Sequence, residues 1–87
     1  MDIVKLIKDV INPLVDNKDG IVIKQLPNED ETEEIYLVVA DSHDIAKLIG
    51  KGGNVANSIR EIVHIAGKLN NRVIRVKFEA FEESELD

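Results

Sequence analysis

Three glycines within four residues, at positions 50, 52 and 53, divide a long helical pattern into two parts. The part before them is short, with Ile45, Leu48 and Ile49 as its apolar positions. The part after them, expected over residues 54–69, places apolar residues at steps of three and four: Val55, Ile59, Ile62, Val63 and Ala66. Because glycine disfavours the helical conformation, we expect two helices joined by a tight, exposed turn.

The residues on either side complete an α+β pattern. An amphipathic helix is expected over residues 2–15, with Asp2 as its cap and with its last turn kinked or shortened by Pro13. Its apolar stripe consists of Ile3, Ile7, Val10 and Leu14, widened by Val4, Leu6, Ile11 and Val15. Residues 21–26, 35–40 and 73–78 have the composition of strands. The order α-β-β-α-α-β predicts a three-stranded sheet with helices packed on one face.

Turn and capping residues predict the element boundaries. Asp41, followed by a second acid at position 44, is a helix-start signal. Gly67 and the pair Asn70 and Asn71 are expected to end the long helix. The acidic residues 27–34 are expected to form a long, solvated hairpin loop. We expect a single domain over residues 1–78, with a core at 35–78, an N-terminal helix and strand at 2–26, and a frayed acidic tail at 79–87.

The charge of the chain is unevenly distributed. The net charge of −6 disfavours a nucleic-acid partner at first sight. Residues 45–78, however, contain seven basic residues and one acid, a net charge of +6 in the segment that holds the glycine turn. Phosphates respond to the local field within a Debye length of about 8–10 Å. The sequence has no cysteine, no signal-peptide pattern and no apolar run near the ~18 residues of a membrane helix, so we expect a cytoplasmic protein.

The glycine turn has the residue types of a phosphate-binding loop. Without Cβ atoms, glycines let a nucleic-acid backbone lie against the loop. The start of the next helix attracts an anion, and Lys51 adds a positive charge. A dinucleotide-binding fingerprint would need a preceding strand and a glycine in place of Val55, and a Walker A loop would need Ser or Thr after Gly-Lys. What remains is a GxxG turn, Gly50 to Gly53, between two helices.

Residues 45–56 resemble the signature of KH domains; they read IAKLIGKGGNVA. The preceding helix and strand fit the type II arrangement, and residues 12–16, NPLVD, close the first helix. Over roughly residues 1–78 the chain resembles the small stand-alone bacterial KhpA (YlqC) family. This resemblance implies an RNA chaperone-like protein, without a cofactor, that grips about four nucleotides of single-stranded RNA with the GxxG loop and an adjacent apolar groove. It also implies pairing with itself or with a second KH-containing protein.

The resemblance further implies which residues contact RNA. Those expected to hold phosphates are Gly50, Lys51, Gly52 and Gly53. Those expected to line or support the groove are Ile49, Val55, Ala56 and Ile59, with strand residues near Val38, although Ile59 fits a place in the core better. The RNA-binding set is completed by Lys47, Asn54 and Arg60, and the phosphate track could extend over Lys68, Arg72, Arg75 and Lys77. Alanine at position 56 predicts a shallow groove, and the lack of aromatic residues near the turn predicts binding without base stacking.

Other functions have less support from the sequence. An enzyme is not expected, because His43 and His64 lack metal-ligand spacing and neither Ser42 nor Ser58 shows a triad signature. A helix-turn-helix DNA reader is disfavoured by the residues that its second helix would expose: Asn57, Ser58, Arg60 and Glu61. One alternative stays open, a KH-fold module for dimerisation or another protein contact with weak or vestigial RNA affinity.

Overall fold

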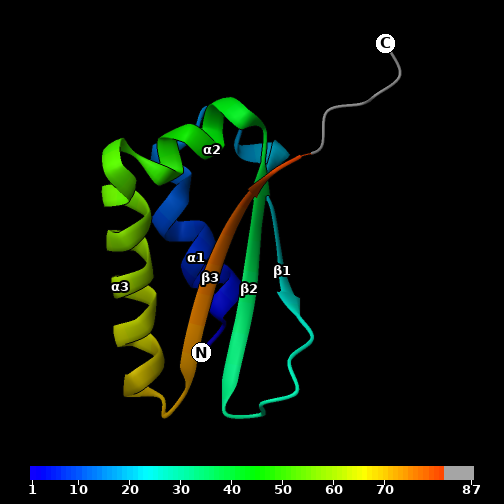
Figure 1. The fold of residues 1–87 in the computed structure, drawn as a ribbon, viewed down its shortest axis with the longest axis vertical. Helices are drawn as coiled ribbons and strands as arrows, with labels where there is room; N and C mark the ends of the chain where they lie inside the picture. Colours follow the sequence, from blue (N-terminus) through cyan, green and yellow to red (C-terminus); the bar gives the residue numbers. More distant parts are fainter. Residues whose placement is uncertain (82–87) are drawn as a thin grey trace.

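A computed structural model describes residues 1–81 of the chain. Its helices are α1 (Ile3–Ile11), α2 (Ser42–Ile49) and α3 (Asn54–Leu69), and its strands are β1 (Val22–Leu26), β2 (Glu33–Ala40) and β3 (Val73–Ala80). The predicted α+β order is confirmed, with the three helices on one side of the sheet (Figure 1). The strand β3 includes Glu79 and Ala80, which were expected in the tail. The rest of the expected tail, residues 82–87, lies outside the described residues.

The sheet has the order β1-β2-β3, so β2 is central and β3 is an edge strand. The pairing of β1 with β2 is antiparallel, with Val22 opposite Val39. The pairing of β2 with β3 is parallel, with Tyr36 opposite Val76. A parallel neighbour requires a long crossover connection, and α2, the glycine turn and α3 supply it. The glycine turn therefore lies within the crossover that covers the sheet.

The first helix ends earlier than its apolar pattern predicts. Asp2 caps its start by accepting the N–H of Lys5 at 3.1 Å, as expected. The helix stops at Ile11, and a 3₁₀ turn over Asn12–Leu14 contains Pro13, which has no N–H to continue the helical bonding. The buried stripe consists of Ile3, Ile7, Ile11 and Val15. The assignment of Leu14 to the stripe is wrong, because the 3₁₀ turn leaves this side chain 40% exposed.

The long helix α3 has the predicted bounds but a different inner face. Its buried residues are Ala56, Ile59, Val63 and Gly67, whereas Ile62 is 48% exposed. Gly67 does not end the helix; it lies inside it, where a Cβ would stand 2.8 Å from the carbonyl oxygen of Arg72. The helix ends at Leu69, and Asn71 follows with a φ of 57° in the left-handed region. Glycine at position 67 thus allows β3 to approach the helix closely.

The hydrophobic core lies between the sheet and the helices. It joins α1, the inner face of the sheet, α2 and α3 through Ile7, Ile11, Val38, Leu48 and Val63, all of which are fully buried. This core holds the two helices that flank the glycine turn in fixed positions. Among the helices of residues 1–81, none combines the length and apolar character needed to cross a bilayer.

Candidate nucleic-acid interface

The three glycines of the turn adopt conformations that other residues rarely adopt. Gly50, Gly52 and Gly53 have φ angles of 73°, 63° and 80°, in the region that glycine occupies without steric cost. Gly50 also ends α2 by donating its N–H to the carbonyl of Ala46 at 2.9 Å, and a Cβ at this position would collide with Val55. Around Gly52 and Gly53 the space is open. Gly50 thus serves packing, while the other two leave room for a close ligand.

The start of α3 is available to an anion. Gly53 occupies the cap position, and no side chain caps the helix there. The first N–H groups of a helix have no intrahelical acceptors, and the helix dipole gives this end a partial positive charge. The side chain of Lys51 is exposed beside them. Backbone donors, dipole and ammonium group together form a phosphate-binding arrangement of the kind found at helix N-termini.

Some of the apolar residues near the turn lie at the surface, and others are buried beneath it. Ile49 is 39% exposed, and Val55 is half-buried. Ala56 and Ile59 are buried in the interior, so they can support a groove from beneath but cannot contact RNA directly. Val38 is likewise fully buried, in the central strand, so it can support the site from within the core but does not line a surface groove. The strand beside α3 is β3, as Figure 1 shows.

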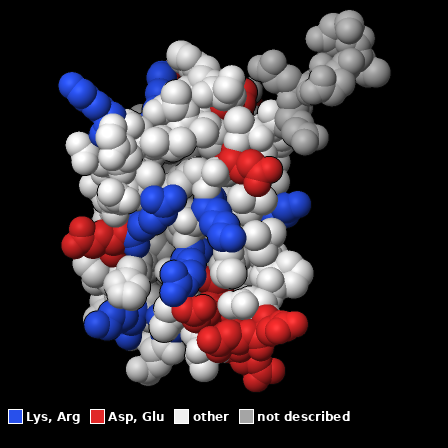
Figure 2. Space-filling view, in the orientation of Figure 1, with Lys and Arg blue, Asp and Glu red and all other residues white. Residues whose placement is uncertain are grey.

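Arg60 crosses the space between α3 and β3. Its Nε donates to the carbonyl oxygen of Val76 at 3.1 Å, and its guanidinium carbon lies 5.4 Å from the centre of the Phe78 ring. Lys and Arg side chains gather over the middle of the face formed by these two elements (Figure 2). Acidic side chains are concentrated at the lower right of the same view, near the connection from β1 to β2. The uneven charge of the sequence is therefore also uneven in space.

Several of the predicted cations are already paired with carboxylates. Lys47 donates to Asp16 at 2.7 Å, away from the glycine turn. Arg75 donates to Glu33 at 2.9 Å. Arg72 holds Glu34 through both Nε and Nη2, and this guanidinium lowers the pKa of the Glu34 carboxyl. Within residues 1–81, the members of the predicted set that have no carboxylate partner within 4 Å are Lys51, Arg60, Lys68 and Lys77.

Comparison with known sequences agrees with this geometry. The family described as "KhpA/KhpB, KH domain" matches residues 4–78. The chain belongs to this KH-domain family. The RNA-binding protein KhpA of Bacillus subtilis is 38% identical over 78 residues, which cover 88% of this chain and 90% of the relative. The RNA-binding protein KhpA of Listeria monocytogenes is 34% identical over 73 residues, covering 84% and 93%. The corresponding protein of Aquifex aeolicus is 36% identical over 73 residues, covering 78% and 90%. These relatives are named for RNA binding, not for a reaction, in agreement with the expectation of a non-enzymatic protein.

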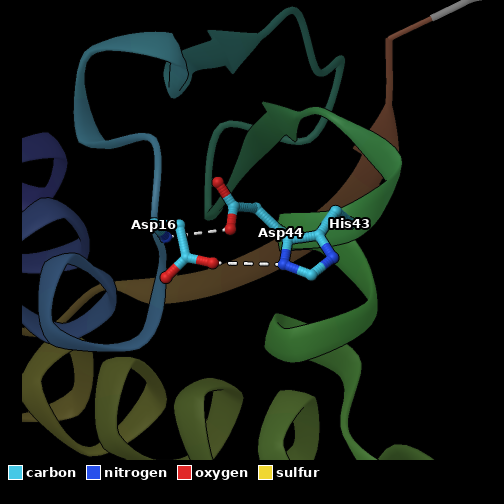
Figure 3. Close-up of side chains that lie close together, drawn as sticks. All are labelled: Asp16, His43 and Asp44. Atoms are coloured by element: carbon cyan, nitrogen blue, oxygen red, sulfur yellow. Dashed lines mark hydrogen bonds and ion pairs between the residues drawn. The ribbon is translucent and has the colours of Figure 1, made fainter.

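A second cluster of polar side chains joins α2 to the loop after α1 (Figure 3). Asp16, His43 and Asp44 bring possible metal ligands within 4.8 Å of one another. Both oxygens of Asp44 accept backbone N–H groups, from Asp16 at 2.9 Å and Asn17 at 3.0 Å. Asp16 is bound by His43 at 3.1 Å and by Lys47. These bonds engage the carboxylates, so the cluster ties the loop after α1 to α2.

Sequence reasoning missed three of these contacts. Asp44 was expected only as a capping-box acid, although it is 1% exposed and bonded to a distant loop. Arg60 was expected to meet phosphates, and its bond to β3 was not foreseen. His64 was considered only as a metal ligand; it is exposed and lines a hollow between α3 and β3. The +6 charge of residues 45–78 was the available signal for Arg60, but a net charge does not identify the partner of a side chain.

Proposed function

We propose that the protein is a cytoplasmic, RNA chaperone-like protein that holds single-stranded RNA by its backbone at Gly50, Lys51, Gly52 and Gly53. The uncapped start of α3 behind two open, left-handed glycines carries this proposal. Phosphate oxygens placed there would accept the N–H groups that have no acceptor within the turn, with Lys51 as counter-charge. The N–H groups of Gly53 and Asn54 already donate to the carbonyls of Gly50 and Lys51. The relatives, which are named RNA-binding proteins, support RNA as the ligand.

In this proposal, an apolar groove next to the turn determines which form of RNA fits. Ile49, Val55 and Asn54 stand beside the turn, and Arg60 closes the far side against β3. Bases can enter such a groove only when they are splayed away from a partner strand. The test is a comparison of a single-stranded RNA with its own duplex by fluorescence anisotropy. We expect micromolar binding of the single strand and much weaker binding of the duplex; equal affinities would refute the clamp.

We further propose that the protein works in pairs, with a second copy or with another KH-containing protein. One strip of α3 supports this: Ile62, Ile65 and Leu69 are 48%, 51% and 80% exposed and recur at helical spacing. Exposed apolar residues grouped in this way are typical of interaction surfaces. At 100° per residue, the strip points away from the side of α3 that carries Arg60 and His64. Pairing and RNA binding can therefore occur at the same time.

A further inference from the structure

A hollow of about 340 Å³ lies between α3 and β3, farther along α3 than the glycine turn. Its lining consists of Arg60, Glu61 and His64 from α3, and of Val73, Ile74, Arg75 and Val76 from β3. At a rise of 1.5 Å per residue, His64 lies about 15 Å along the helix from Asn54. The hollow is thus in line with the proposed phosphate clamp but separate from it. Its volume is at the small end of ligand pockets, which span about 300–1,000 Å³.

The wall formed by β3 offers hydrogen-bonding groups as well as apolar surface. As an edge strand, β3 has no strand neighbour on this side, so its outer edge presents backbone N–H and C=O groups. The carbonyl of Val76 already accepts the Nε of Arg60, which shows that groups of this edge reach the hollow. Val73, which is 37% exposed, adds apolar surface. A flat ring with polar atoms at its rim fits such a wall.

The side chains contributed by α3 favour a base over a phosphate in the hollow. Glu61 would repel a phosphate but can accept a hydrogen bond from an amino group of a base, as acidic side chains do with cytosine. His64 is exposed and offers an aromatic ring on which a base can stack. The cations nearby are Arg60 and Arg75, and Arg75 is partly neutralised by Glu33. We therefore expect these arginines to contact the RNA backbone that leads into the hollow, and not the base inside it.

We propose that this hollow is an additional subsite for one nucleobase of the strand whose backbone the glycine turn holds. The base stacks on His64 against the edge of β3, and Arg60 stands between this subsite and the turn. The subsite rests on the proposed RNA function and extends it, because it makes the bound segment longer than the part held at the turn. It also supplies a stacking surface, since the ring comes from a histidine and not from Phe, Tyr or Trp.

The length of the bound RNA tests the subsite. Affinities for randomised single-stranded RNA tetramers and heptamers are measured by anisotropy with the whole chain. A heptamer gains about fourfold from its additional registers alone, and a stacked base should add roughly tenfold more. His64→Ala should remove this additional preference and leave tetramer binding unchanged. His64→Phe, which keeps a stacking ring, should retain it.

His43→Ala is the matched control, because it removes the other exposed histidine, which lies on α2 away from the hollow. It should leave the ratio of heptamer to tetramer affinity as in the parent. The subsite is refuted if the parent shows only the statistical gain, or if His64→Ala keeps the full preference. In both cases tetramer binding would persist and the clamp would stand. Absence of binding to either RNA would refute the clamp and the subsite together.

Discussion

The side-chain carboxylate of Asp44 accepts the backbone N–H of Asp16 at 2.9 Å, across 28 residues of sequence. Its other oxygen accepts the N–H of Asn17 at 3.0 Å. Asp44 is 1% exposed and stands in the first turn of α2, whose cap is Asp41. The two backbone bonds favour the ionised carboxylate and therefore lower the pKa of Asp44. This one side chain fixes the helix before the glycine turn to the loop that follows α1.

Replacing Asp44 should destabilise the fold. An amide in Asp44→Asn keeps only one acceptor, and its NH₂ group would face a backbone N–H that needs one. Leaving a buried donor without a partner is costly, and we expect the melting temperature at neutral pH to fall by roughly 5–15 °C for a domain of this size. Differential scanning calorimetry checks this. Asp19→Asn, which removes the same charge at an exposed position, should melt within about 2 °C of the parent.

The difference between parent and Asp44→Asn should depend on pH. Because the pKa of Asp44 is lowered by folding, its contribution is present above the unfolded value of 3.8 and is lost as the pH falls through the lower folded value. The two melting temperatures should therefore be farthest apart near neutral pH and converge below about pH 4. The pKa of Asp16 is also lowered, by Lys47 and His43, so only this difference, measured at each pH, reports on Asp44. A gap that persists unchanged at pH 2 would contradict the assignment.

Local signals in the sequence were sufficient for the order of the elements and for several of their ends, but not for the contacts between them. The bounds of α3 and the capping by Asp2 and Asp41 depend on neighbours within a few residues. The bonds of Asp44 to a loop 27 and 28 residues away have no local signature. The sequence also does not show which strand lies at the sheet edge beside α3. That choice depends on the strand order, which only the folded crossover determines.

The close approach of β3 to α3 at Gly67 is a second contact that only the fold reveals. It predicts that alanine at this position destabilises the protein, although helix propensity alone predicts the opposite. Alanine in a helix is usually better than glycine by about 1 kcal/mol. In Gly67→Ala the new Cβ would stand 2.6 Å from Cγ1 of Ile74 and 2.8 Å from a backbone oxygen. We expect a net loss of about 1–3 kcal/mol in the free energy of unfolding, measured with urea. Ser58→Ala, at an exposed site of the same helix, should change it by less than about 0.5 kcal/mol.

The exposed strip of α3 predicts self-association that one charge can remove. Ile65→Glu places a carboxylate at a position that is 51% exposed in the single chain. The fold should remain stable, whereas a paired interface would have to bury this charge without a partner. In sedimentation equilibrium at tens of micromolar, we expect the parent to form dimers and Ile65→Glu to be monomeric. Asn57→Glu, on another side of the helix, is the control. A monomeric parent, alone and mixed with a KH-containing partner, would remove the pairing proposal.

The proposed clamp also predicts a modest dependence of RNA affinity on salt. A single strand gives a slope of about −0.7 per neutralised phosphate in a plot of log K against log salt concentration. Two or three phosphates held by the turn, Lys51 and Arg60 should therefore give a slope of roughly −1.5 to −2. Anisotropy titrations between about 50 and 200 mM salt measure this directly. A slope near zero would show that backbone phosphates are not the principal contact.

The role of the glycine turn can be tested by introducing carboxylate side chains while its backbone conformation is kept. Gly52 has a φ of 63°, a conformation that Asp and Asn tolerate better than most residues. The double variant Lys51→Asp with Gly52→Asp therefore carries backbone strain, and Lys51→Asn with Gly52→Asn carries the same strain without the carboxylates. Comparing the two variants separates charge from conformation. Both should fold, since the side-chain space at position 52 is open, and circular dichroism with a melting curve must show that their stabilities match.

With matched stabilities, the acidic variant should bind single-stranded RNA at least about tenfold more weakly than the amide variant. Each carboxylate next to a phosphate costs on the order of 1 kcal/mol at an exposed contact. The amide variant should itself lose part of the parent's affinity, because it lacks the Lys51 ammonium group. Its salt slope should be smaller in magnitude by about 0.7, corresponding to one phosphate contact. If the acidic variant folds and binds RNA as tightly as the amide variant, the turn does not hold the backbone, and the KH fold of this chain serves protein contacts instead.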